Sequence, residues 1–596
     1  MYSPLSTDLK EIRLLTILPG QFNDVIHCTL HVVSLTAKPV YDALSYVWGD
    51  PAITREIHVQ GDPHQVTSNL EKGLRHLRLA DKPRVIWIDA LCINQADLAE
   101  RGSQVAQMGS IYRGAREVIA WLGEEEDSSN LALDFAEAGS SLSYWCRGSS
   151  SPVTQAILGS QHVQALGALM NRLWWQRVWT FQELVLAKSL YFVCSQRRMN
   201  AEVFFAMGRT YFSHSNTCSK CDSSQKPHRE DIVRLNEMLA ILVMLDSSRQ
   251  DAEQLHIPHT IALYRGRECT DPRDKIYGFR GLEAVNKGSS SRPPDYSSSV
   301  SDVYAQAAIN LIATHKELVV FSQLLPRCAP HKSLISDDIP TWAPDWSAKA
   351  TQQVSLDMYT RMTNLRLYNA SAPSPVHFRS REFRRLSLKG RVVGTIGSLS
   401  DPCPSDHRAD ANIYYGWRHF ARIDERYDAT YAGRDDITFG DAYWQTLCAA
   451  IVPARSGITD LGDVVRTDPK KHRMLHDTWW DSVLPDDDVD GRRHLQARPD
   501  IVAGIDIAQF FNCVGIATTM RRFFVDEKEH GWMGLVPQDA EEGDRIAVID
   551  GGRVPYVIRP SDREPGCWTL VGDAYVHGIM DGEIMTLSEP RDMVMV

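Results

Sequence analysis

The chain has 596 residues, of which 43% are hydrophobic and 23% charged, and its formal net charge is −11. These values are typical of a globular protein with well-buried cores, and the length predicts two to four domains. The acidic balance argues against a general nucleic-acid binder, which needs a basic face to pair with phosphates.

The sequence also predicts the compartment. The first twenty residues lack a basic start followed by an apolar core, so we expect no signal peptide. The longest apolar run, at 239–245, is too short to span a bilayer. The 12 cysteines are scattered without a regular framework, which is typical of reduced thiols. We therefore expect a cytoplasmic protein with no membrane span and no nucleic-acid partner.

Residues 1–194 alternate strand-like and helix-like patterns, which predicts an α/β domain with a parallel, flavodoxin-like sheet and flanking helices. The expected strands cover 12–18, 27–33, 43–47, 85–88 and 118–122. One helix is expected over 69–79. Another is expected to begin at Asp97, which lies three residues before Glu100 in a capping pattern.

Two further regions follow. Residues 195–382 are expected to be mainly helical, most strongly at 232–245 and 303–325. Residues 383–596 are expected to be β-rich, and the turn Asp550-Gly551-Gly552 between two apolar runs predicts a hairpin. The short strands at this end favour a small β-barrel or β-sandwich.

Polar side chains follow two predicted strands, in YDALSYVWGD (41–50) and VIWIDALCINQ (85–95). Ligands collect at the carboxyl ends of strands in an open parallel sheet, so Ser45, Trp48, Asp89 and Asn94 are candidate site residues. The structural alternatives are that Trp48 covers the sheet edge and that Asp89 caps the next turn.

The segment NRLWWQRVWTFQELVLAK (171–188) is predicted to form one helix with two faces. Its apolar face carries tryptophans, and its polar stripe carries Arg172, Gln176, Thr180 and Glu183. The pattern alone favours a solvated polar stripe. The alternative places Glu183 toward the strand ends, where a carboxylate can hold a sugar.

Cysteines give two weaker hypotheses. Cys92 lies in the second strand-end motif without a nearby histidine, which favours inert packing over nucleophilic catalysis. Cys218 and Cys221, between His214 and His228, have a zinc-like spacing, although loop cysteines explain them as well. A charged block at 271–275 is interpreted as architectural, and we expect it to form an ion-paired turn between domains.

Four blocks, at 41–50, 85–95, 100–123 and 177–187, resemble the fungal heterokaryon incompatibility (HET) domain in order and spacing. The resemblance implies a HET domain over 1–194, with its core at 41–188. It also implies a role in non-self recognition, in which such domains trigger or execute cell death. The HET domain in turn is remotely similar to TIR domains, some of which cleave NAD.

The similarity to TIR enzymes implies specific residues. Ser45-Tyr46 matches a dipeptide at the end of a TIR strand, and Glu183, four residues after Trp179, matches the catalytic glutamate. Carried over, Glu183 is the candidate catalytic carboxylate, and the pocket candidates are Ser45, Tyr46, Trp48, Asp89 and Asn94. NAD is then the substrate, and no metal or cofactor is required.

Three functional hypotheses follow. In the first, the HET domain is a signalling and assembly module with protein partners, including other copies of the chain. In the second, it is a TIR-like NAD glycohydrolase that uses Glu183. In the third, the chain is an accessory protein of a metabolic gene cluster.

Overall fold

The computed structural model divides into two compact units, Met1–Ile257 with Arg267–Ser297, and Pro258–Gly266 with Ser298–Val596. Residues of the predicted helical region at 195–382 therefore belong to both units. No helix among the described residues is long and apolar enough to cross a membrane. The structure describes residues 2–141, 145, 160–217, 229–287, 293–328, 331, 333, 335, 338–404, 412–432, 434–454, 464–483, 507–526, 531–586 and 589–596.

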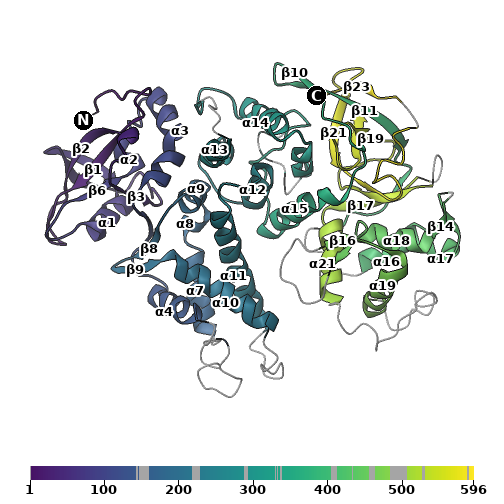
Figure 1. The fold of residues 1–596 in the computed structure, drawn as a ribbon, viewed down its shortest axis with the longest axis horizontal. Helices are drawn as coiled ribbons and strands as arrows, with labels where there is room; N and C mark the ends of the chain where they lie inside the picture. Colours follow the sequence, from purple (N-terminus) through teal and green to yellow (C-terminus); the bar gives the residue numbers. More distant parts are fainter. Residues whose placement is uncertain are drawn as a thin grey trace. The chain divides into compact units, whose positions relative to one another are not determined.

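A nine-stranded sheet with the order β5-β4-β2-β1-β6-β3-β7-β8-β9 forms the centre of the first unit (Figure 1). Its strands are β1 (Glu11–Ile17), β2 (His27–Ser34), β3 (Asp42–Ser45), β4 (Thr54–Val59), β5 (Asp62–Thr67), β6 (Arg84–Trp87), β7 (Val118–Gly123), β8 (Leu190–Cys194) and β9 (Arg197–Asn200). Strand β3 pairs in parallel with β6 and β7, and β7 pairs in parallel with β8. The predicted α/β class is confirmed, although antiparallel pairs such as β1–β2 make the whole sheet mixed.

Helices complete the first unit. They are α1 (Ser68–Leu77), α2 (Asp89–Cys92), α3 (Leu98–Gly114), α4 (Ser129–Gly139), α7 (Ser160–Met170), α8 (Leu173–Gln176), α9 (Trp179–Val185), α10 (Ala201–Thr217), α11 (Arg229–Gln250) and α13 (Asp274–Lys287), with η1 (Leu35–Ala37) after β2. Helix α3 begins where the capping pattern predicts. The Asp97 carboxylate accepts hydrogen bonds from the backbone N–H groups of Ala99 and Glu100 at 3.0 and 3.1 Å.

The predicted single helix over 171–188 is wrong, because the chain breaks between α8 and α9. Arg177 at the break has an extended backbone, with φ −73° and ψ 139°. There the Val178 N–H donates to the Glu268 carbonyl at 2.9 Å, and the Glu268 N–H donates to the Gln176 carbonyl at 2.6 Å. The predicted solvated stripe is also wrong at its second half, since Glu183 is only 6% exposed.

The second unit begins with helices and continues with mixed elements. Its helices are α12 (Ile257–Tyr264, whose first residue belongs to the first unit), α14 (Val300–His315), η2 (Val319–Gln323), α15 (Gln352–Asn364), η3 (Leu365–Leu367), α16 (Asn412–Phe420), α17 (Ile423–Arg426), α18 (Phe439–Leu447), α19 (Pro469–Val483) and α21 (Ile507–Thr518). The mainly helical character predicted for the middle of the chain is confirmed.

Strands β10 (Phe378–Arg381), β11 (Arg385–Thr395), β19 (Arg545–Ile549), β20 (Tyr556–Pro560), β21 (Trp568–Asp573) and β23 (Arg591–Met595) form one sheet in the second unit. Because β11 pairs with both β19 and β23, five of these strands close into a barrel. The predicted hairpin is present as β19–β20. The expectation of a β-rich end with a small barrel is therefore confirmed.

A four-stranded sheet packs against this barrel through a shared apolar core. Its strands are β12 (Ser398–Leu399), β17 (Arg521–Val525), β18 (Met533–Pro537) and β22 (Tyr575–Val576). Phe524 and Val536 of this sheet belong to the same buried cluster as Ile546 and Val557 of the barrel. Two short hairpins, β13 (Thr430–Tyr431) with β14 (Arg434–Thr438) and β15 (Ile451–Pro453) with β16 (Val464–Arg466), complete the unit.

Candidate functional site

The parallel pairing of β3 and β6 brings two polar strand ends together. Ser45 is the last residue of β3 and is fully buried, and Asp89 begins α2, two residues after β6 ends. Ala43 of β3 is paired with Trp87 of β6, so the two strands end at the same edge of the sheet. This is the edge at which ligands bind in open parallel sheets, as the sequence predicts.

Helix α9 adds Glu183 to this edge. Two hydroxyl groups, from Ser45 and from Tyr112 of α3, lie within hydrogen-bonding reach of the Glu183 carboxyl group. The indole N–H of Trp174 donates to Ser45 Oγ at 2.8 Å, which leaves the Ser45 proton free for Glu183. Glu183 Oε2 is buried and has no hydrogen-bond partner among the described residues.

The surroundings of Glu183 favour its neutral form. Burial is the largest effect, and the nearby Asp89 charge adds to it, so the pKa of Glu183 rises to about 8. The two hydroxyl groups and the Arg177 guanidinium act in the opposite direction but do not compensate for burial. Glu183 is therefore mostly protonated at neutral pH in the unliganded protein.

Asp89 is held by a different set of groups. Trp48 Nε1 donates to Asp89 Oδ2 at 2.7 Å, and the Ala90 backbone N–H donates to Oδ1 at 2.7 Å. A further hydrogen bond joins the carboxylate to buried Tyr46. Burial raises the pKa of Asp89, and these hydrogen bonds and Arg177 oppose the rise. Trp48 is 36% exposed, so the cluster reaches solvent at this side chain.

The carboxyl groups of Glu183 and Asp89 thus lie in different environments. Asp89 receives several hydrogen bonds, whereas one oxygen of Glu183 receives none from the described residues. Neighbouring carboxyl groups in such different environments can act as an acid–base pair, or as a negative surface that stabilises a developing cation.

Contacts from α13 hold α9 in place. The Arg267 guanidinium, which precedes α13, donates to the Arg177 carbonyl and to Thr180 Oγ1, both at 3.0 Å. Helices α3 and α13 cross at two glycines, because a Cβ on Gly109 would lie 2.8 Å from the Gly281 Cα. A Cβ on Gly281 would likewise overlap the Gln182 side chain of α9. The geometry of the Glu183 cluster therefore depends on small residues at this crossing.

The charged block at 271–275 supports the same helix. Arg273 pairs with Asp271 through two hydrogen bonds of 2.9 and 2.8 Å, so the predicted ion pair is present, but it lies within the first unit and not between domains. Asp274 accepts a 2.9 Å hydrogen bond from the Tyr296 hydroxyl and another from Trp179 at the start of α9. The block thus anchors the first residue of α9.

The other candidates lie outside this cluster or outside the described residues. Asn94 Oδ1 accepts from the Ala96 N–H at 3.3 Å, so its side chain closes the turn before α3. Cys92 is fully buried, and burial raises the pKa of its thiol to about 12, which agrees with inert packing. Cys218 and Cys221 lie outside the described residues. Within the described ranges no cluster of three or more metal-ligating side chains is present.

Three members of the cluster were not among the sequence candidates. Tyr112 shares an apolar stripe with the core residues of α3, and Trp174 is one of several tryptophans in its segment, so neither has a distinctive pattern. Arg177 lies in a segment predicted to be helical, and its position depends on the break described above. These residues are identified only by the three-dimensional structure, which places them beside the strand ends.

Comparison with known proteins agrees with this organisation. Residues 41–183 match the family model described as heterokaryon incompatibility protein (HET), and residues 458–596 match the Het-6 β-barrel domain. The heterokaryon incompatibility protein 6, OR allele, of Neurospora crassa is 26% identical over 672 aligned positions, which cover 99% of this chain and 97% of that protein. No solved structure matches the chain significantly. The chain is therefore similar to heterokaryon incompatibility proteins both in its N-terminal α/β region and in its C-terminal barrel region.

Proposed function

We propose that this protein acts in fungal non-self recognition, where its HET domain triggers the death of cells that fuse with an incompatible partner. The alignment with heterokaryon incompatibility protein 6 along nearly the whole chain carries this proposal. One segment in each half of the chain, 41–183 and 458–596, matches a domain of that protein class, so recognition and execution are expected to reside in one polypeptide.

A fusion assay tests this role. Strains that express the full chain are fused with strains that differ from them at this locus, and uptake of a membrane-impermeant dye is scored in the fused cells. We expect dye uptake to require the chain and to disappear when its gene is deleted. Equal uptake with and without the gene would contradict the proposal.

For the signalling mechanism, the tryptophans of α8 do not offer a docking surface. Trp174 and Trp175 are only 1% and 7% exposed. Assembly through protein partners or self-association would instead use the outer strands β5 and β9 of the large sheet, which have unpaired edges in the described structure.

A second candidate activity is hydrolysis of the nicotinamide ribosyl bond of NAD. The observation that favours it is the burial of Glu183 beside Ser45 and Asp89 at the strand ends. In this reaction the C1′–N bond breaks, and its electron pair leaves with nicotinamide. Water adds to C1′ and gives up a proton, so the products are ADP-ribose, nicotinamide and H⁺. The ionised Glu183 carboxylate would stabilise the oxocarbenium-like transition state.

Protonation of Glu183 sets the expected pH dependence of this activity. Because its pKa is about 8 in the unliganded protein, the carboxylate form is the minor one at pH 7. NAD carries a positive charge on its nicotinamide ring, so binding it beside Glu183 would favour ionisation. We expect kcat/KM, which reports the free enzyme, to rise with pH up to about 8.

Nicotinamide release by the purified full chain, at high protein concentration with a crowding agent, tests the activity. Wild type is compared with Glu183→Gln and with Glu125→Gln, a matched change at an exposed carboxylate. We expect about 100-fold or greater loss in Glu183→Gln and none in the control. The hydrolase proposal would be contradicted if the folded, self-associated wild type released no nicotinamide, or if Glu183→Gln released as much as the wild type. Assembly through protein partners would then be the remaining mechanism.

A further inference from the structure

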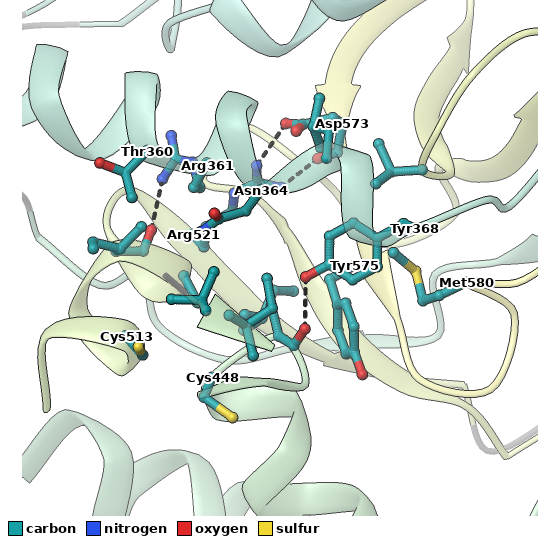
Figure 2. Close-up of a pocket in the computed structure, with 18 of the residues that line it drawn as sticks. Thr360, Arg361, Asn364, Tyr368, Cys448, Cys513, Arg521, Asp573, Tyr575 and Met580 are labelled. Carbon is teal, nitrogen blue, oxygen red and sulfur yellow. Dashed lines mark hydrogen bonds and ion pairs between the residues drawn. The ribbon is translucent and has the colours of Figure 1, made fainter. Parts of the chain in front are cut away.

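A cavity of about 340 Å³ lies in the second unit, far along the chain from the residues discussed above (Figure 2). Helices α15 and α21, the hairpin β15–β16 and strands β17, β18 and β22 contribute its lining. Its volume lies within the range of sites for small organic molecules, at the lower end of roughly 300–1,000 Å³. Neither the proposed recognition role nor NAD hydrolysis uses this cavity.

One end of the cavity carries excess positive charge. Arg521 is paired with Asp573 at 2.5 Å, so its charge is compensated. Arg361 donates to the backbone carbonyls of Thr519 and Ile516 at 3.0 and 3.3 Å, but no carboxylate of the described residues lies within ion-pair distance. Burial, together with the Arg521 charge, lowers the pKa of Arg361 to about 10, although the charges of Asp573 and Asp357 act in the opposite direction. A half-buried cation in this state gains from an anionic partner.

An unsatisfied acceptor lies next to this cation. Asn364 follows Arg361 by three residues on α15, so the two side chains share one face of the helix. Asn364 is 6% exposed, and in the described structure its Oδ1 is buried without a hydrogen-bond partner. A buried acceptor without a donor is costly, and a ligand donor beside Arg361 would satisfy it.

The remaining walls are apolar and aromatic. The rings of Tyr368 and Tyr575 lie 6.1 Å apart, and Figure 2 shows both on the same side of the cavity as Met580. Their hydroxyl groups are already engaged, Tyr368 with the Ala449 carbonyl at 2.6 Å and Tyr575 with a histidine ring at 2.8 Å. The rings therefore offer apolar faces to a ligand.

We propose that this cavity binds a small carboxylic acid that carries a hydrogen-bond donor next to its carboxylate and an apolar or aromatic body, as in an aromatic 2-hydroxy acid. The carboxylate pairs with Arg361, the adjacent hydroxyl donates to Asn364 Oδ1, and the body lies against Tyr368 and Tyr575. The C-terminal half of the chain is thereby a small-molecule receptor.

Three matched probes test each contact by calorimetric titration into the full chain. They are 3-phenyllactate in both enantiomers, 3-phenylpropionate, which lacks the hydroxyl, and 3-phenylpropane-1,2-diol, which lacks the carboxylate. We expect one phenyllactate enantiomer to bind at least tenfold more tightly than either of the other two probes. Absence of binding, or equal affinity for the three probes, would overturn the proposal.

Variants then assign the contacts. Arg361→Gln is expected to weaken phenyllactate binding at least tenfold, whereas Arg366→Gln, at an exposed arginine outside the cavity, leaves it unchanged. Arg361 also donates to two backbone carbonyls, so its replacement can disturb the local fold. Asn364→Leu is an independent test, because it removes a buried acceptor that has no partner in the described structure. We expect Asn364→Leu to bind phenyllactate and phenylpropionate equally. The proposed contacts would be refuted if folded Asn364→Leu preferred phenyllactate over phenylpropionate as the wild type does. They would also be refuted if folded Arg361→Gln bound phenyllactate with wild-type affinity.

Discussion

Replacing Glu183 with glutamine should change how the stability of the first unit depends on pH. The folded pKa of about 8 lies above the ordinary value of 4.5, because burial disfavours the charged form. Between these two values the folded protein keeps a proton that the unfolded chain releases. The contribution of Glu183 to the free energy of unfolding is therefore fully present below pH 4.5, and it is lost as the pH rises through 8.

The size of the effect follows from the separation of the two pKa values. Each pH unit between the two pKa values lowers the free energy of unfolding by about 1.4 kcal/mol. Relative to low pH, the wild type therefore loses about 1 kcal/mol of this free energy by pH 5 and about 5 kcal/mol by pH 9. Glutamine keeps the shape of the side chain but does not ionise. The stability advantage of Glu183→Gln over wild type should therefore grow by about 4 kcal/mol from pH 5 to pH 9.

Differential scanning calorimetry of the full chain at pH 5, 7 and 9 measures this difference. At roughly 2 °C per kcal/mol for a domain of this size, the gap in Tm between variant and wild type should widen by about 8 °C. Glu125→Gln, at an exposed carboxylate, should show a constant gap. A constant gap for Glu183→Gln would refute the inference that Glu183 is neutral in the folded protein.

Three further substitutions test the packing around both units, with calorimetry as the common measurement. Gly281→Val should lower stability by about 1–3 kcal/mol, because its side chain would overlap α3 and α9, whereas an unchanged Tm would contradict the close crossing. Trp174→Phe removes the N–H donor to Ser45 and should cost about 1 kcal/mol; a neutral effect would show that this hydrogen bond contributes nothing. Arg391→Met leaves buried Asp550 without its 3.0 Å ion pair and should cost about 3–5 kcal/mol, in the transition of the second unit alone.

The sequence predicts the frame of the site well, because buried parallel strands leave a strong signal. The strand-like run at 43–47 and the continuous apolar run at 85–88 identify β3 and β6, and the polar residues at their carboxyl ends include Ser45 and Asp89. It does not predict the β4–β5 hairpin, whose strands are rich in polar residues and lie at the sheet edge. Edge strands lack the apolar pattern that burial on both faces imposes.

The surroundings of Glu183 could not be predicted from periodicity. Helical spacing correctly groups Thr180 with Glu183, but the predicted solvent exposure is wrong for both. The reason is a contact with a distant segment, in which Glu268 interrupts the helix at Arg177 and redirects α9. Burial of a carboxyl group is decided by such long-range packing, which a pattern within one helix does not contain.

The closure of the C-terminal barrel has a consequence for how the protein is made. Apart from the short strand β10 that precedes it, strand β11 finds its partners in β19 and β23, about 150 and 200 residues later in the chain. At about 5–20 residues per second, a ribosome needs at least 10 s to deliver the second partner. For that time β11 has unpaired edges, which are prone to wrong pairing. The nascent chain of this protein should therefore depend on chaperones that shield β11 until β23 is synthesised.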